Sequence, residues 1–189
     1  MTNKLILASS SDSRRTLLNR LGVPFSVRHP LVNETIRETD SVIETVSRLS
    51  REKALSVPKK TNEIIIGSDQ LGELNELAFG KPLSRDENIN QLLTFSGQIV
   101  SFYTSLFVIR VRDQEVRKTV VVSKLKFRNL THEDAAFYVE NETALESAGG
   151  FKLEGLGISL LEEFYSNDPT AIIGLPLIET ARFLRELNY

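Results

Sequence analysis

The sequence predicts a mixed α/β fold in which a twisted sheet is flanked by helices. Short apolar runs alternate with amphipathic segments along the chain, a pattern typical of strand–helix–strand units. One long stretch rich in β-branched and aromatic residues, 99–127, interrupts the alternation and indicates an antiparallel hairpin around residues 113–114. The chain has 189 residues, enough for a sizeable core, and we expect it to form two lobes around a central cleft.

The first expected elements are a buried strand at residues 5–8 and a helix opened by Arg14 and Arg15. Three serines, at 9–11, lie between them. A strand, a short polar turn and a helix N-terminus form a common phosphate site, because free backbone N–H groups and the helix dipole attract anions. A serine-capped connection without a ligand is an equally good interpretation of this segment alone.

Two strands and two capped helices follow. We expect strands at 23–28 and 63–67, the second apolar on both faces and therefore central in the sheet. Each helix, over 41–57 and 84–95, opens with serine and carries glutamate three residues later, the spacing of a capping box. A polar excursion before Gly80 is interpreted as a hairpin.

The last third of the chain is expected to contain two helices, one strand and several turns. Thr131 caps a helix that reaches 142, and glycines punctuate residues 149–157 before a strand at 158–164. A final helix follows the turn at 174–176 and runs to about Leu187. Together these elements complete the predicted alternation.

Composition excludes several classes of site. The chain has no cysteine and only two histidines, so thiolate metal sites, a cysteine nucleophile and a multi-histidine metal site are ruled out. A net charge of −2 gives no general attraction to nucleic acid or to an acidic membrane surface. No run approaches the roughly 18 apolar residues that span a bilayer, and we expect a cytoplasmic location with neither nucleic acid nor membrane as partner.

Four charged residues are candidates for chemistry. Asp69 is expected at the carboxyl end of the strand 63–67, where ligands gather in open α/β sheets, and Glu34 is a second acid in a polar loop. Lys53 and Lys81 are possible phosphate partners. Three of them also have a simpler interpretation: a turn cap for Asp69, a solvated carboxylate for Glu34, and a solvated helix face for Lys53.

Ordered motifs across the whole chain resemble the Maf family of nucleotide pyrophosphatases. They lie at residues 5–9, 14–15, 34–35, 52–54, 66–69, 80–82, 96–97, 148–149 and 173–176. The resemblance implies one domain over residues 1–189 with an architecture like that of inosine triphosphate pyrophosphatases. Residues 67–70, 99–104, 127–130, 151–155 and 168–169 look most like the 7-methyl-GTP pyrophosphatase branch.

The resemblance also implies roles for individual residues. Asp69 matches the proton acceptor, and Ser13, Gln70 and Glu154 match positions that tune the choice of base. The cluster that binds phosphate and a divalent cation is expected to consist of Ser9, Arg14, Glu34, Lys53, Asp69 and Lys81, with Mg²⁺ or Mn²⁺ held by the two carboxylates.

This chain departs from the family pattern after its serine-rich turn. Asp12 stands in place of the usual proline, and Ser13 stands where the 7-methyl-GTP branch typically has tryptophan, a residue absent from the whole chain. A methylated guanine is cationic and favours stacking on an aromatic ring. Two alternatives to 7-methyl-GTP hydrolysis therefore stay open: a dTTP/UTP or general noncanonical nucleotide pyrophosphatase, and a non-catalytic nucleotide-binding regulator of cell division. A homodimer is possible through the hairpin strands.

Overall fold

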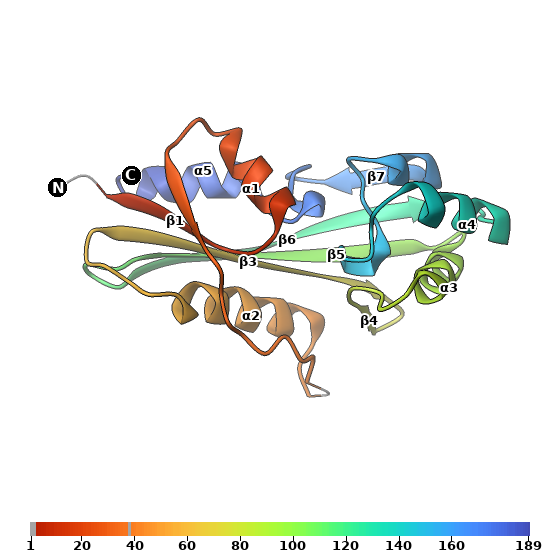
Figure 1. Ribbon diagram of the computed structural model, residues 1–189, viewed down its shortest axis with the longest axis horizontal. Helices are drawn as coiled ribbons and strands as arrows, with labels where there is room; N and C mark the ends of the chain where they lie inside the picture. Colours follow the sequence, from red (N-terminus) through yellow and green to blue (C-terminus); the bar gives the residue numbers. More distant parts are fainter. Residues whose placement is uncertain (1–2, 38) are drawn as a thin grey trace. The chain divides into compact units, whose positions relative to one another are not determined.

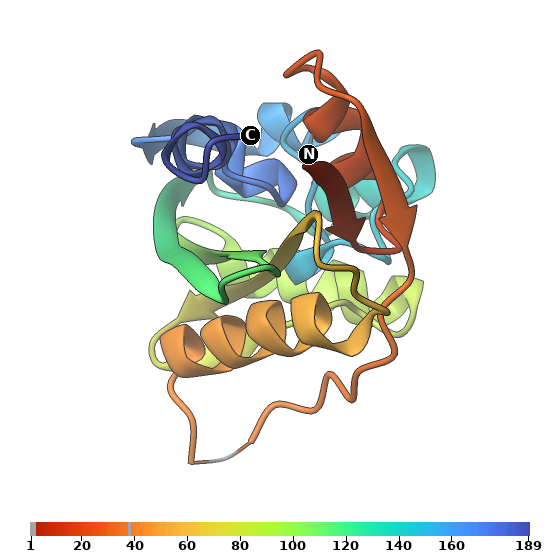
Figure 2. The same ribbon diagram turned by 90° about the vertical axis from the view of Figure 1, so that its left-hand side faces the viewer.

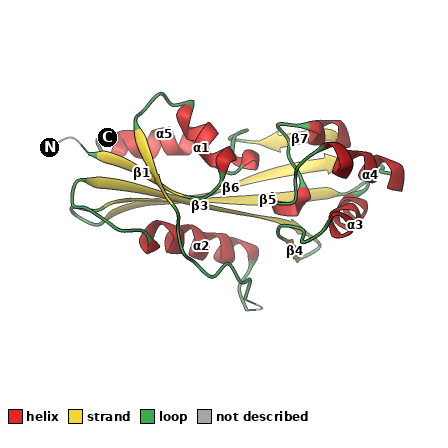
Figure 3. Ribbon diagram, viewed as in Figure 1, coloured by secondary structure: helices red, strands yellow, loops and turns green. Residues whose placement is uncertain are grey.

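The computed structural model of this protein describes residues 3–37 and 39–189. Its helices and strands are shown in Figure 3. In chain order they are β1 (Lys4–Ala8), α1 (Asp12–Asn19), β2 (Phe25–Arg28), α2 (Val42–Ser56), β3 (Glu63–Leu74), β4 (Leu77–Phe79), α3 (Arg85–Phe95), β5 (Ile99–Arg110), β6 (Glu115–Phe127), α4 (His132–Asn141), η1 (Ala148–Gly150), η2 (Leu156–Leu160), β7 (Leu161–Ser166), η3 (Ala171–Ile173) and α5 (Leu177–Glu186).

Within the described residues the strands form a seven-stranded mixed sheet with the order β2-β1-β3-β5-β6-β7, and β4 pairs with β3. Strand β1 runs parallel to both β2 and β3, so that Leu7 lies opposite Val27 on one side and Ile66 on the other. The β3–β4 and β6–β7 pairs are antiparallel. The predicted mixed α/β class is therefore confirmed.

The chain divides into two compact units. The first contains the residues up to Asp69 together with Thr104–Val121 and Asp168–Tyr189, and the second contains Gln70–Tyr103 and Val122–Asn167. Two units agree with the two lobes expected from the sequence.

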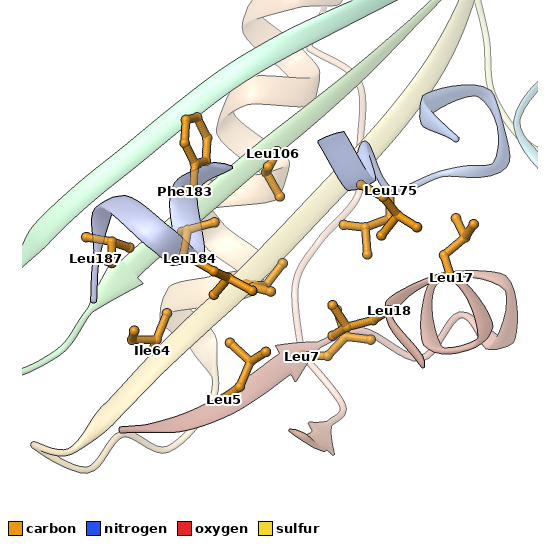
Figure 4. Packing of buried hydrophobic residues seen from close by; sticks show 13 residues of the cluster. Leu5, Leu7, Leu17, Leu18, Ile64, Leu106, Leu175, Phe183, Leu184 and Leu187 are labelled. Atoms are coloured by element: carbon orange, nitrogen blue, oxygen red, sulfur yellow. The ribbon is translucent and has the colours of Figure 1, made fainter. Parts of the chain in front are cut away.

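Helices cover both faces of the strands in the first unit. Helices α1 and α5 lie on one face of these strands and α2 lies on the other (Figures 1 and 2). Because side chains alternate along a strand, Leu5 and Leu7 pack on the face of α1 and α5, whereas Ile6 and Ala8 pack on the face of α2. Figure 4 shows the first of these clusters. In it, Leu18 of α1 and Phe183 of α5 pack with the side chains of the strands. Burial on both faces explains why these strands read as continuous apolar runs.

Aromatic rings form much of the core of the second unit. Phe95 on α3 contacts Phe79 on β4 and Phe127 on β6, with ring centroids 4.9 and 5.3 Å apart. Phe151 contacts Phe127 at 5.4 Å and Phe102 on β5 at 6.2 Å. Edge-to-face and tilted pairs of this kind add stability beyond the apolar area that they bury. The chain of rings ties α3, β4, β5 and β6 to the segment after η1.

The predicted helices are confirmed, and the expected capping residues stand at the starts of α2, α3 and α4. Ser41 and Glu44 form the full capping box of α2, and Thr131 forms another with Asp134 at α4. At α3 the Ser84 hydroxyl accepts a hydrogen bond from the N–H of Glu87, but the Glu87 carboxylate accepts from Leu83. At all three helices the hydroxyl of the N-cap residue accepts a hydrogen bond from a backbone N–H that has no partner within the helix.

Three expected boundaries are wrong. Strand β3 continues to Leu74 instead of ending at Asp69, because its last residues pair with β4 in a hairpin whose turn residues, Asn75 and Glu76, have positive φ angles. Helix α1 begins at Asp12, ahead of the two arginines, because Ser11 caps it. Residues expected to open the strand at 158–164 form the 3₁₀ turn η2, and β7 begins only at Leu161.

None of the helices formed by residues 3–37 and 39–189 has both the length and the apolar character needed to cross a membrane.

Candidate functional site

A close approach between α2 and β3 builds the centre of the candidate site. An ideal Cβ placed on Gly67 would lie 2.1 Å from the carbonyl oxygen of Ser50 and 2.9 Å from the backbone nitrogen of Ala54. Only glycine allows the helix backbone to lie this close to the strand. The contact brings Lys53, the residue before Ala54, to the same face of β3 as Asp69, two residues beyond Gly67.

Lys53 links two carboxylates in this part of the first unit. Its Nζ lies 2.6 Å from Oδ1 of Asp69 and 2.7 Å from Oε1 of Glu34. The side chains of Lys53 and Asp69 are only 6% and 8% exposed, whereas that of Glu34 is 50% exposed. A lysine on a solvated helix face would not be buried in this way, so the simpler interpretation of Lys53 is wrong.

Burial changes the proton affinity of Asp69. Loss of solvent around its carboxyl raises the pKa above the usual value of 3.8, and the charge of Glu34 acts in the same direction. The positive charges of Lys53 and Arg14, with the hydrogen bond from Lys53, act in the opposite direction. A buried carboxylate with a raised pKa is a stronger base than a solvated one while it stays ionised near neutral pH.

Asp69 lies inside β3 and not at its end, yet it still occupies the edge that the sequence indicated. The neighbouring parallel strand β1 ends at Ala8, whose predecessor Leu7 pairs with Ile66. Strand β3 therefore runs on past the carboxyl end of β1, and Asp69 lies in that extension. The carboxyl ends of parallel strands are where open α/β sheets bind ligands.

Arg14 is held at the start of α1 by the turn that precedes α5. Its Nε donates to the carbonyl oxygen of Gly174 over 2.8 Å, and the hydroxyl of Ser68 lies 2.9 Å from the same oxygen. Gly174 has a φ of 121°, which an L side chain rarely adopts. Burial lowers the pKa of the Arg14 guanidinium, and the charges of Asp69 and Glu34 oppose that shift, so Arg14 lies within the electrostatic reach of both carboxylates.

The serine turn before α1 uses two of its backbone amides internally. The N–H of Ser11 donates to the hydroxyl of the buried Ser9, and the N–H of Arg14 donates to the hydroxyl of Ser11. These amides were among those expected to face a phosphate. Asp12 is the first residue of α1 and forms an exposed ion pair with Arg15, 2.9 Å apart. Asp12 thus occupies the helix position that proline also favours, and Ser13 follows it, half-buried.

The remaining predicted residues, Gln70, Lys81 and Glu154, belong to the second unit. Lys81 is exposed and forms a surface ion pair with Glu146 over 3.3 Å, a contact weak enough to be replaced by a ligand. The turn before it is fixed, because the carbonyl oxygen of Gly80 accepts from the N–H of Gly149 over 2.8 Å.

Glu154 lies exposed in a turn that other groups hold in place. A carboxylate oxygen of Glu142 accepts from the N–H of Leu156 over 3.0 Å, and the same oxygen lies so close to Gly155 that a Cβ there would be 2.0 Å away. The N–H of Lys152 donates to the hydroxyl of Tyr138 over 2.9 Å. The position of the Glu154 backbone is therefore set by its neighbours.

The structure brings together Lys53, Asp69, Glu34 and Arg14 as a charged cluster in the first unit. Three further residues that contact this cluster or the loop of Glu34 have no role in the sequence-based predictions: Gly67, Ser68 and Arg48. Gly67 and Ser68 directly precede Asp69 in the motif at residues 66–69, and their spacing before Asp69 is a usable signal. Arg48 contacts Thr35 and Asp40, and it also contacts Glu52 on its own helix. Only the four-residue spacing to Glu52 is visible in the sequence.

Glu34 and Asp69 fit a divalent cation that also binds phosphate. One oxygen of Glu34 and one oxygen of Asp69 both contact the ammonium of Lys53. The distance between these two oxygens is therefore no greater than the sum of the two contact distances. Mg²⁺ is commonly held by one or two carboxylates, with waters and substrate phosphates completing its shell. Among residues 3–37 and 39–189 no group of three or more His, Cys, Asp or Glu side chains is placed to hold a metal ion.

Comparisons with known proteins give one consistent result. A family model described as "Maf-like protein" matches residues 4–187. A 7-methyl-GTP pyrophosphatase of Hydrogenovibrio crunogenus is 42% identical over 98% of this chain and 93% of its own. Proteins of the same name from Aromatoleum aromaticum and Burkholderia lata are 41% and 40% identical, over 97% and 98% of this chain and 95% and 90% of theirs.

Among solved structures, a HAM1 protein from Coxiella burnetii covers 67% of this chain and 73% of its own, with 17% identity and a TM-score of 0.43. At this identity and TM-score, the likeness supports no conclusion about this protein.

Proposed function

This chain belongs to the Maf-like protein family, and on that premise we propose that it is a nucleoside triphosphate pyrophosphatase. It hydrolyses 7-methyl-GTP to 7-methyl-GMP and diphosphate, a reaction in which water attacks the α-phosphorus and the bond to the bridging oxygen breaks. Relatives about 40% identical carry this activity in their names. Residues 1–189 act as one domain with two compact units.

The buried Lys53–Asp69 pair, with Glu34 beside it, is the observation that best supports this proposal. Asp69 orients the attacking water and accepts its proton on the carboxylate. Burial raises the pKa of Asp69, which favours proton acceptance. The ammonium of Lys53 favours the ionised form of this carboxylate, because its charge lowers the same pKa.

Cationic groups bind the phosphates. An ammonium has three N–H donors, and Lys53 uses two on Asp69 and Glu34, which leaves the third for a phosphate oxygen. The guanidinium of Arg14 has further N–H donors besides Nε, which donates to the carbonyl oxygen of Gly174. Lys81 contributes a further charge, and Ser9 belongs to the turn that leads into the N-terminus of α1, where the helix dipole favours an anion.

Glu34 and Asp69 would hold a divalent cation, Mg²⁺ or Mn²⁺, together with phosphate oxygens. A cation so bound offsets the charge that develops on the phosphates. Side chains of this protein perform the other steps that we assign. Asp69 accepts the proton of the attacking water, and Arg14, Lys53 and Lys81 orient the triphosphate.

Ser13, Gln70 and Glu154 select the base. A carboxylate at Glu154 suits a cationic methylated guanine, whereas Ser13 provides no aromatic ring to stack on it. This departure favours one alternative, a pyrophosphatase for dTTP and UTP or a general pyrophosphatase for noncanonical nucleotides. The substrate is a small nucleotide in either case. A cytoplasmic location and a homodimer stay predictions.

Diphosphate release from a panel of nucleotides tests the proposal. The panel contains 7-methyl-GTP, GTP, dTTP, UTP and inosine triphosphate, each with Mg²⁺ or Mn²⁺. We expect 7-methyl-GTP to be hydrolysed fastest, and we expect Asp69→Asn to lower turnover about 10²- to 10⁴-fold, the usual contribution of a general base. Asp86→Asn is the matched control, because Asp86 is exposed in the first turn of α3.

Each outcome separates one part of the proposal from the others. Hydrolysis led by dTTP or UTP would refute the base preference and leave the reaction intact. A fully active Asp69→Asn would refute the role of Asp69. No release from any nucleotide would favour the non-catalytic regulator.

A further inference from the structure

The loop that carries Glu34 has little apolar packing to hold it. Residues 33–37 are all exposed. The side-chain oxygen of Asn33 accepts hydrogen bonds from both the N–H and the hydroxyl of Thr35, over 3.1 and 2.5 Å. This small turn fixes the local shape around Glu34. It does not by itself attach the loop to the rest of the first unit, so the position of Glu34 depends on polar contacts from outside the turn.

Arg48 on α2 supplies such contacts through three different nitrogens. One terminal nitrogen donates to the carbonyl oxygen of Thr35 over 3.0 Å, and Nε donates to Asp40 over 3.2 Å. The other terminal nitrogen reaches Glu52 over 3.4 Å, one helical turn further along α2. The Arg48 side chain is 16% exposed, and that of Asp40 is 19% exposed. The planar guanidinium therefore joins the loop, the start of α2 and the turn of α2 that leads to Lys53.

We propose that Arg48 is a positioning residue for the reaction, which acts by fixing the Glu34 loop against α2. Glu52, the helical partner of Arg48, directly precedes Lys53, and Lys53 contacts Glu34. Arg48 thus holds the loop beside the segment of helix that Glu34 must meet. The proposal rests on the proposed function, in which Glu34 helps to bind the cation and the phosphates.

Replacement of Arg48 by methionine tests this role. Methionine keeps the apolar part of the side chain and removes all three donors. Arg51→Met is the matched control, because Arg51 lies on the same helix and is exposed. Arg48→Lys is a second variant that keeps the charge and cannot form the three-way contact. We expect Arg48→Lys to recover the thermal stability that Arg48→Met loses, but not to fix the position of the Glu34 loop.

Amide hydrogen exchange of the peptide that covers residues 32–37 is the first readout. We expect exchange at least several-fold faster in Arg48→Met and in Arg48→Lys than in Arg51→Met, because the loop loses its anchor. Exchange that is no faster than in the control overturns the proposal. This measurement needs no turnover, so it stays decisive even if the chain hydrolyses none of the nucleotides in the panel.

The second readout is the dependence of diphosphate release on Mn²⁺. Loss of a residue that orients a metal ligand typically costs about 10- to 100-fold in metal affinity or activity. We therefore expect the half-saturating Mn²⁺ concentration to rise by that factor in Arg48→Met, with a smaller change in kcat. An equal fall in kcat with no change in the Mn²⁺ requirement overturns the proposal.

A double variant distinguishes positioning from a general structural effect. If Arg48 acts through Glu34, Glu34→Gln combined with Arg48→Met loses little more activity than Glu34→Gln alone. Losses that multiply overturn the proposal, because they mean that the two residues act independently.

Discussion

Replacement of Gly67 by alanine should move Lys53 and Asp69, the two buried members of the charged cluster, apart. The added Cβ would lie 2.1 Å from the carbonyl oxygen of Ser50 and 2.9 Å from the backbone nitrogen of Ala54. Both atoms belong to the backbone of α2, so no rotamer change can relieve the clash. Because Cβ atoms essentially never lie closer than 3.0 Å to another heavy atom, helix and strand must separate by about 1 Å, a displacement that a close-packed interior resists.

This displacement sets the size of both expected effects. Overpacking of a core typically costs about 1–3 kcal/mol. In a chain of this length that cost lowers the melting temperature by about 2–12 °C. The shift also lengthens the 2.6 Å contact between Lys53 and Asp69. Misplacement of catalytic groups by about 1 Å can cost about 100-fold in rate, and we expect a loss of that order in kcat/KM.

Thermal unfolding and diphosphate release measure the two effects separately. Gly80→Ala is the control for stability, because a Cβ at Gly80 would meet its nearest atom, on Leu71, at an ordinary 3.8 Å. Its melting temperature should stay within about 2 °C of the wild-type value. A Gly67→Ala protein as stable as wild type, with kcat/KM within about twofold, would refute the claim that close packing at Gly67 positions Lys53.

Two further predictions concern charge and burial. Lys53→Met removes a positive charge that lowers the pKa of Asp69, so that pKa should rise and the acid limb of the kcat/KM profile should move to higher pH; a limb that stays in place would contradict the role of Asp69 as base. Asn88→Ala should leave the melting temperature unchanged or raise it by a few degrees. Both side-chain polar atoms of Asn88 are buried with no partner among the described residues, and alanine is the better helix former. A fall of more than about 4 °C would mean that the amide is satisfied in solution.

Local signals in the sequence were sufficient for most of the helices and strands. Ser41 and Glu44 mark the start of α2 because the capping box is a contact between residues three apart. Pro58 marks its end for an equally local reason, since proline cannot continue a helix. The strand that begins at Glu63 is predictable from its run of apolar residues, without reference to the strands beside it. Such elements are predictable because the interactions that define them lie within a few residues.

The error at Ser68 and Asp69 also has a non-local cause, because distant residues satisfy their polar groups. Ser68 and Asp69 look like the polar end of a strand, yet β3 continues through them. The hydroxyl of Ser68 meets the carbonyl oxygens of Ser105 and Gly174, and the carboxylate of Asp69 meets Lys53. Each partner is at least 16 residues away in the chain. No pattern within the strand could show that these polar side chains are buried and paired.

The residues proposed for hydrolysis and the residue Glu154 proposed for the choice of base differ in burial. Lys53 and Asp69 are buried and contact each other, so a change in either removes an oppositely charged partner from a buried charge, which is costly. Glu154 is exposed, and the turn around it is held by Glu142 and Tyr138 through backbone groups of neighbouring residues. Replacement of Glu154 therefore removes no contact that holds the turn. A chain built in this way can change the base that it prefers, as Ser13 in place of an aromatic residue also suggests, while the charged cluster that we propose for hydrolysis stays the same.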